Sequence, residues 1–266
     1  MKPVMINVDD LGLSAAVNEA VLRLAQIGRI QATSFMSMGT IASDEVAELK
    51  KQNIDIGLHF DLTGFTALGS LKQILIKSYL HAWSKRIIQD AINRQLDAFE
   101  DKIGCEPIFI DGHQHIHQFP QIRSVMLKTL LQRYGNKIAV RSTKSPQHDI
   151  KAKLIYALGG YQLDKSLKQA NITHNHAFAG IYNFNADIKT LQTKWKQWFT
   201  SASEHGLLIM CHPAVPSKSW NDEIKNAREC EWQWLQSEAF IQYWQQHHCQ
   251  AMNWHDIRQK NICHIQ

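Results

Sequence analysis

The 266-residue sequence lacks several features that would assign it to a particular class of protein. It has no run of about 20 apolar residues, the length that a membrane-spanning helix needs, so no membrane span is expected. Its five cysteines are odd in number and form no C-x-x-C pair, which argues against a disulfide framework and a cysteine zinc knuckle. The N-terminal residues lack the apolar core and cleavage site of a signal peptide, so we expect a reducing, cytoplasmic location.

Sequence motifs of several common activities are also absent. The chain has no P-loop, no G-x-G-x-x-G, no G-x-S-x-G and no H-E-x-x-H. Its 29 basic and 24 acidic residues leave a formal charge of +5, and the basic residues are spread along the chain. This pattern favours a solvated surface, so no nucleic-acid partner is expected. No linker or low-complexity tract divides the chain, and we expect a single domain over residues 1–266.

Histidine, in contrast, is abundant, with 14 copies against 24 acids. At neutral pH an unperturbed imidazole is mostly uncharged and able to bind a metal or move a proton. The count alone does not say which histidines act, so their positions relative to the expected secondary structure matter more.

Apolar runs with the period of a strand alternate with amphipathic runs with the period of a helix. This alternation favours right-handed βαβ units and one parallel sheet. About seven strands predict an α/β fold whose sheet closes, or nearly closes, into a TIM-like (β/α) barrel. The expected strands lie at residues 4–8, 30–38, 54–60, 107–110, 137–141, 207–211 and 250–254. The expected helices lie at residues 15–27, 43–51, 71–82, 84–103, 120–134, 150–158, 163–169, 189–200 and 229–247.

Acids and histidines follow the carboxyl ends of four of these strands. In parallel α/β folds this edge of the sheet hosts the active site. Convergence of four separate segments on one edge is more informative than any single residue. The residues are Asp9, Asp10, His59, Asp111, His113, His115 and His212.

Taken singly, these residues also have structural interpretations. One of Asp9 and Asp10 can bind a metal while the other acts as a base, or the pair can be a helix cap and a solvated acid. His59 is equally well explained as a hydrogen-bonded structural residue. His212, stiffened by the proline after it, suits a general acid but also an ordinary loop.

The alternating histidines of HQHIH predict a metal site if the segment is extended. His113 and His115 would then share a face and both reach one cation, whereas His117 would lie too far along the strand. The spacing does not say which histidine binds a metal and which contacts a substrate. Asp111 is placed to orient a ligand histidine.

Together, these segments resemble the YdjC-like carbohydrate deacetylase family, which includes chitooligosaccharide deacetylases and hopanoid-biosynthesis relatives. The matching stretches run in the family's order over about four-fifths of the chain. The DD-x-G-L-S and D-x-H-x-H-x-H-x-F-P elements are the most specific. The stretches are NVDDLGLS, GLHFDLTG, DGHQHIHQFPQI, AVRS and MCHPA, at residues 7–14, 57–64, 111–122, 139–142 and 210–214.

The resemblance implies a distorted (β/α) barrel that binds one divalent cation through an Asp-His-His set. Two histidine ligands suit Zn²⁺, whereas the family is often assigned Mg²⁺, so both stay open. The implied reaction is hydrolysis of the N-acetyl group of an N-acetylated sugar or oligosaccharide, and a homodimer is expected on the same basis. Carried over, the ligands are Asp10, His59 and His113, the general base is Asp9, the acid or oxyanion partner is His212, and His115 and Arg141 line the substrate pocket.

Two other functions stay open from the sequence. Another barrel metallohydrolase, such as a phosphoesterase, would release phosphate, and a non-catalytic sugar-binding protein on the same scaffold would release no product. The chain also departs from the family pattern at three places, Leu11, Asp61 and Gln118. None of these departures removes a proposed ligand. Asp61 adds a negative charge near the site, which puts the family's usual sugar preference in doubt.

Overall fold

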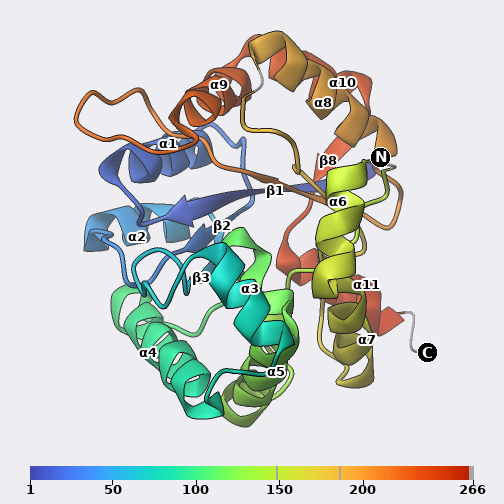
Figure 1. Cartoon of the computed structure of the whole chain (residues 1–266). Coiled ribbons are helices and arrows are strands. Elements are labelled where there is room, and N and C mark those ends of the chain that lie inside the picture. The colour runs from blue at the N-terminus through green and yellow to red at the C-terminus, as the bar shows by residue number, and fades with distance from the viewer. Residues whose placement is uncertain (148, 186, 264–266) are drawn as a thin grey trace.

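The computed structural model describes residues 1–147, 149–185 and 187–263 (Figure 1). The strands are β1 (Lys2–Leu11), β2 (Ala32–Phe35), β3 (Asp55–Phe60), β4 (Phe109–Gly112), β5 (Ala139–Val140), β6 (Phe178–Ala179), β7 (Leu207–Cys211) and β8 (Cys249–Ala251). The helices are α1 (Ala15–Gln26), α2 (Ser43–Lys51), α3 (Leu71–Tyr79), α4 (Lys85–Ile103), α5 (Pro120–Tyr134), α6 (Ile150–Ile155), α7 (Tyr161–Gln169), α8 (Ile188–Ser201), α9 (Lys225–Gln236), α10 (Glu238–Gln246) and α11 (Trp254–Cys263), with shorter turns η1 (His113–Gln118) and η2 (Tyr156–Gly160).

The strands form one curled, parallel sheet in the order β5-β4-β3-β2-β1-β7-β6, and β8 pairs with the start of β1. The central strand β1 is buried from Val4 onward, and its residues 4–8 lie beside residues 207–211 of β7. The helices surround the sheet, with α8, α9 and α10 gathered together at one end of the molecule (Figure 1). The predicted (β/α) barrel is therefore confirmed.

The barrel is irregular where its two edge strands, β5 and β6, face each other. These strands share no ladder. Isolated backbone bonds link the segments around them instead: the Val140 N–H donates to the Thr173 carbonyl at 2.9 Å, and the Phe178 N–H donates to the Lys144 carbonyl at 2.8 Å. The sheet thus nearly closes through loop backbone.

One expected element is wrong, since residues 229–247 do not form a single helix. The chain breaks at Ser237, whose hydroxyl accepts the Phe240 N–H at 3.2 Å and so caps α10. The break keeps both helices on the core, because Trp234 of α9 and Phe240 of α10 pack edge to face with ring centroids 5.7 Å apart. Because the apolar pattern continues across Ser237, the sequence gives no signal of this turn. Among the described residues, no helix is both long and apolar enough to cross a membrane.

Candidate metal centre and active site

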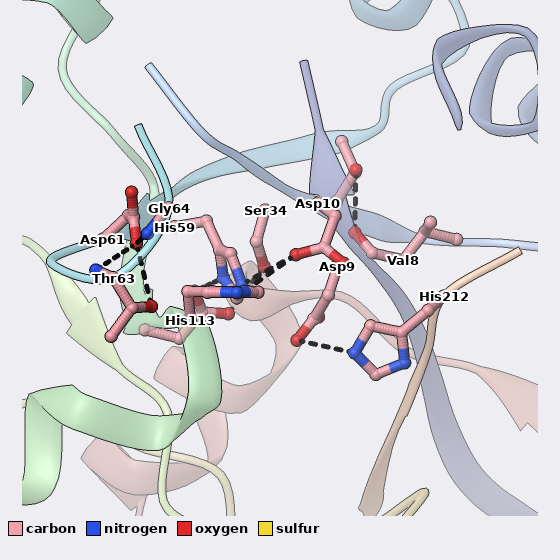
Figure 2. Close-up of polar contacts among 12 residues, drawn as sticks. Val8, Asp9, Asp10, Ser34, His59, Asp61, Thr63, Gly64, His113 and His212 are labelled. Atoms are coloured by element: carbon pink, nitrogen blue, oxygen red, sulfur yellow. Dashed lines mark hydrogen bonds and ion pairs between the residues drawn. The ribbon is translucent and has the colours of Figure 1, made fainter. Parts of the chain in front are cut away.

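An irregular end of β1 turns two neighbouring acids toward the same cavity. The pairing of β1 with β2 shifts register between Val8 and Leu11, and Asp10 adopts a left-handed backbone with φ of 69°. On a regular strand, adjacent side chains point to opposite faces. The bulge therefore explains how Asp9 and Asp10 both line one cavity (Figure 2).

Three side chains from separate elements converge beside this bulge. Asp10 Oδ1 lies 3.3 Å from His59 Nε2 and 3.1 Å from His113 Nδ1. One ligand atom from each residue lies within 4.8 Å of the others, so the three can share a cation (Figure 2). A carboxylate oxygen with two imidazole nitrogens is a donor set that divalent cations such as Zn²⁺ accept. The residues present therefore fit a divalent metal.

Asp111 fixes the orientation of one of these histidines. Its Oδ1 atom lies 2.6 Å from His59 Nδ1, which leaves Nε2 directed at Asp10. The second oxygen of Asp111 accepts the Ser34 hydroxyl at 2.6 Å and lies 2.5 Å from Arg141. Such a carboxylate sets the tautomer and the angle of a metal-binding imidazole. The sequence predicted that Asp111 orients a ligand histidine, and in the structure that histidine is His59.

The carboxylates around His59 favour positive charge at its ring. Burial alone would lower the pKa of His59, but the neighbouring Asp111 and Asp10 outweigh it and raise the pKa to about 10. Without a metal, the His59 ring is therefore protonated on both nitrogens and positively charged at neutral pH. The Nε2 proton must leave before this nitrogen can bind a cation.

Metal binding is accordingly expected to release about one proton at pH 7, and the affinity should rise by up to about tenfold per pH unit below the pKa of His59. Calorimetric titration of the metal in two buffers of different ionisation enthalpy measures the released proton directly. An affinity that stays flat between pH 6 and pH 8 would contradict this assignment.

The HQHIH segment is not extended, so the condition under which His113 and His115 would share one face is not met. The segment forms η1, in which Gln114 and His115 have left-handed backbones with φ of 54° and 59°. The turn folds tightly over Gly112, where a Cβ atom would lie 2.9 Å from the His117 nitrogen. The three histidines of η1 therefore point in different directions and do not share one face.

Each histidine of η1 has a separate environment. His113 faces Asp10, whereas His115 lines the cavity and packs edge to face on Phe178 with ring centroids 5.6 Å apart. Burial and the nearby His117 lower the pKa of His115 well below its ordinary value, so this ring is neutral. His117 is buried, with Nε2 3.0 Å from the Arg141 carbonyl, and it holds the end of β5.

Arg141 lies beneath Asp9 and is fully buried. Two of its nitrogens bind the two oxygens of Asp9 at 2.7 Å each. Burial would raise the pKa of Asp9, but Arg141 outweighs it and lowers the pKa below its ordinary range. The buried position of Arg141 therefore fits a role in orienting Asp9 and keeping it ionised. It fits the substrate contact expected from the sequence less well.

A second trio of candidate ligand atoms, from Asp9, His59 and Asp111, also lies within 4.8 Å. Arg141 already binds both of its carboxylates. A guanidinium in this place competes with a metal ion for the same oxygens, so the Asp10 trio is the better cation site.

His212 stands across the cavity floor from Asp9, with Nε2 4.0 Å from Asp9 Oδ2 (Figure 2). Burial lowers its pKa to about 4 despite the nearby Asp10 and Asp9, so the ring is neutral at pH 7. Its edge packs on Phe184 at a centroid distance of 5.2 Å. A neutral imidazole here can offer a single N–H to a ligand.

Two buried residues of α9 support the site and were missed from the sequence. The Glu231 carboxylate accepts the His212 backbone N–H and, at 2.8 Å, the Tyr182 hydroxyl, and burial raises its pKa to about 7. Arg228 binds Asp10 Oδ2 at 2.7 Å. Their three-residue spacing, which places both on one face of a helix with a buried side, was the available signal.

Asp61 does not act on the cavity as the sequence suggested. Its Oδ1 atom accepts the backbone N–H groups of Thr63 and Gly64 at 2.8 and 2.7 Å, so the carboxylate faces its own loop (Figure 2). The side chain is buried. Gln118, another departure, ties η1 to α6 because its amide donates to the Ile155 carbonyl at 2.7 Å.

The cavity over these residues has a volume of about 1160 Å³. This volume is above the range of about 300–1,000 Å³ that is common for small-molecule sites. Part of its lining is aliphatic and comes from α3 and α6, and another part comes from the loop after β7. The lining includes Leu71, Leu75, Leu154 and Ile155 from the helices and Trp220, Asp222 and Glu223 from the loop.

Comparisons with known proteins found related sequences and related folds. A chitooligosaccharide deacetylase of Salmonella paratyphi C is 28% identical over 222 residues, covering 79% of this chain and 81% of the relative. A structure from Enterococcus faecalis V583, named for cellobiose-phosphate cleavage, has a TM-score of 0.71 at 16% identity and covers 96% of this chain and 98% of its own. A peptidoglycan N-acetylglucosamine deacetylase has a TM-score of 0.52 at 11% identity, covering 94% and 85%.

The two structural matches establish the fold alone, since both are distant in sequence. The assignment rests on the family model of YdjC-like proteins, which matches residues 3–246. That range contains nearly all of β1 with its two acids, the histidine of β3, the histidines of η1, the turn after β7 and helix α9. With nearly its whole length matched, this chain belongs to the YdjC-like protein family.

Proposed function

We propose that this protein is a metal-dependent carbohydrate deacetylase that removes the acetyl group of an N-acetylated sugar or oligosaccharide. The observation that carries the proposal is the trio of Asp10, His59 and His113 on the floor of a large cavity, beside Asp9 and His212. Relatives named chitooligosaccharide deacetylase support the sugar substrate, and the cavity volume of about 1160 Å³ favours more than one sugar ring.

The metal would be held by Asp10, His59 and His113, with Mg²⁺ or Zn²⁺ as the candidates. A bound divalent cation supplies Lewis acidity to the acetamide carbonyl and lowers the pKa of water. Asp9 accepts one proton from the attacking water at its carboxylate. Arg141 keeps that carboxylate ionised and aimed, because it binds both oxygens from the buried side.

His212 acts on the other side of the reacting amide. Its neutral ring donates an N–H to the carbonyl oxygen as negative charge develops there. The water oxygen bonds to the carbonyl carbon, the carbon–nitrogen bond breaks, and the leaving amine takes up the proton that Asp9 accepted. His212 Nε2 lies 4.0 Å from Asp9 Oδ2, beyond direct hydrogen-bond distance, so passage of that proton through His212 requires a bridging water. His115, a neutral ring in the cavity wall, would bind the sugar.

The expected result is acetate release from N-acetylated chitooligosaccharides, lost by roughly a hundredfold or more after metal removal with a chelator and restored by adding Mg²⁺ or Zn²⁺. Acetate is measured by a coupled assay on protein stripped of metal and then reloaded. Phosphate release from a phosphorylated sugar, without acetate, would point to a phosphoesterase. Substrate binding with neither product would point to a sugar-binding protein. Either outcome would sink the proposal.

A further inference from the structure

Arg228 is a buried cation that touches four parts of the site. It is 3% exposed. Its guanidinium binds Asp10 Oδ2 at 2.7 Å and Asp222 Oδ2 at 2.5 Å. It also donates to the His212 carbonyl at 3.3 Å and lies 5.6 Å from the centroid of the Trp220 ring. The planar fork of arginine, with five donors, allows one side chain to span such separate acceptors.

The contact between Arg228 and Asp10 occupies one carboxylate oxygen and leaves the other oxygen available to bind a metal. Oδ2 is bound by Arg228, while Oδ1 faces His59 and His113. The carboxylate is thereby held in one rotation about its last bond. Carboxylates that bind metals are in turn hydrogen-bonded by partners of this kind.

The other contacts hold the loop between β7 and α9, which Figure 1 shows as a long excursion before α9 begins. Trp220 and Asp222 of this loop line the cavity. Arg228, on the first turn of α9, reaches back to bind Asp222 and to pack against Trp220. The loop wall is therefore fastened to the same guanidinium that fixes Asp10.

We propose that Arg228 is a positioning residue that couples the metal ligand Asp10 to the loop of residues 215–224, of which residues 220–224 line the cavity. The metal half of this inference rests on the site proposed above. The positive charge of Arg228 and its positioning of Asp10 have opposite expected effects on the metal affinity. A cation beside a metal repels it, so by charge alone the loss of Arg228 would tighten metal binding, whereas loss of its positioning role would weaken it.

The test uses full-length protein stripped of metal, with R228M as the main variant. Calorimetric titration with Zn²⁺ alone is expected to show binding weakened by about 10–100-fold, the range for residues that orient metal ligands. Hydrogen exchange should become faster in residues 215–224. Equal or tighter Zn²⁺ binding by R228M, or unchanged exchange in the loop, would overturn the inference.

Two further variants keep the test decisive if R228M does not fold. R228K retains the charge but not the fork, and it should also bind Zn²⁺ more weakly than the native protein. D222N should speed exchange in the loop while Zn²⁺ affinity stays within about threefold, because Asp222 does not touch Asp10. The control is Q233A, at an exposed position of the same helix, which should match the native protein in both measurements. Neither measurement needs a substrate, so native protein that binds Zn²⁺ but releases no acetate refutes the proposed function separately.

Discussion

Replacing His113 with alanine is expected to abolish acetate release and to weaken binding of the divalent cation by more than about a hundredfold. The change removes one of three ligand atoms that lie within 4.8 Å of one another, whereas a residue that only orients a ligand costs about 10–100-fold. The side chain of His113 is 24% exposed, so its loss should not unfold the protein. Metal titration by calorimetry and the acetate assay measure the two effects.

His255 offers a matched control for this change, since it is an exposed histidine on α11 far along the chain from the site. His255→Ala should leave metal affinity and acetate release as in the native protein. Normal deacetylation by His113→Ala would refute the ligand assignment. Unchanged metal affinity with lost activity would show that His113 contacts the substrate and not the metal.

Replacing Asp9 with asparagine should lower acetate release by about 10²–10⁴-fold, the usual contribution of a general base, while the metal affinity stays within a few-fold. Asparagine keeps the shape of the side chain but accepts no proton. Its amide group also meets Arg141, which binds both oxygens of the native carboxylate, so a lower melting temperature is expected.

The metal titration separates this role from a general disturbance of the site. If Asp9→Asn lost the metal together with activity, Asp9 would itself be a ligand, as in the alternative trio with His59 and Asp111. Retained metal with retained activity would instead remove Asp9 from the mechanism. The expected pattern, retained metal with lost activity, is specific to a base beside the cation.

Much of the fold could be predicted from the sequence, because apolar patterning records burial directly. The strand at residues 207–211 and the helix at 120–134 have their expected bounds. The convergence of acids and histidines also followed, since parallel strands all end at one edge of the sheet. Position along strands was therefore enough to bring seven acids and histidines to one edge of the sheet, and the resemblance to the YdjC-like family singled out Asp10, His59 and His113 among them as ligands.

The partners of these residues could not be predicted in the same way. Arg141 binds Asp9 across 132 positions of sequence, and Arg228 binds Asp10 across 218. No local pattern encodes which buried charge will face which other one, because that depends on how helices pack on the sheet. The left-handed backbones of η1 were hidden as well, since only a few per cent of non-glycine residues adopt this conformation and Gln114 is not of a type enriched in it.

The pairing of each neighbouring acid with its own arginine sets the charge balance of the buried centre. Arg141 lies against Asp9 and Asp111, and Arg228 lies against Asp10 and Asp222, so each guanidinium offsets part of the negative charge of two carboxylates. The arginines thereby reduce the repulsion between these carboxylates. Were a divalent cation to replace the His59 proton, the centre would gain one net positive charge, which favours an anionic transition state over a neutral amide substrate.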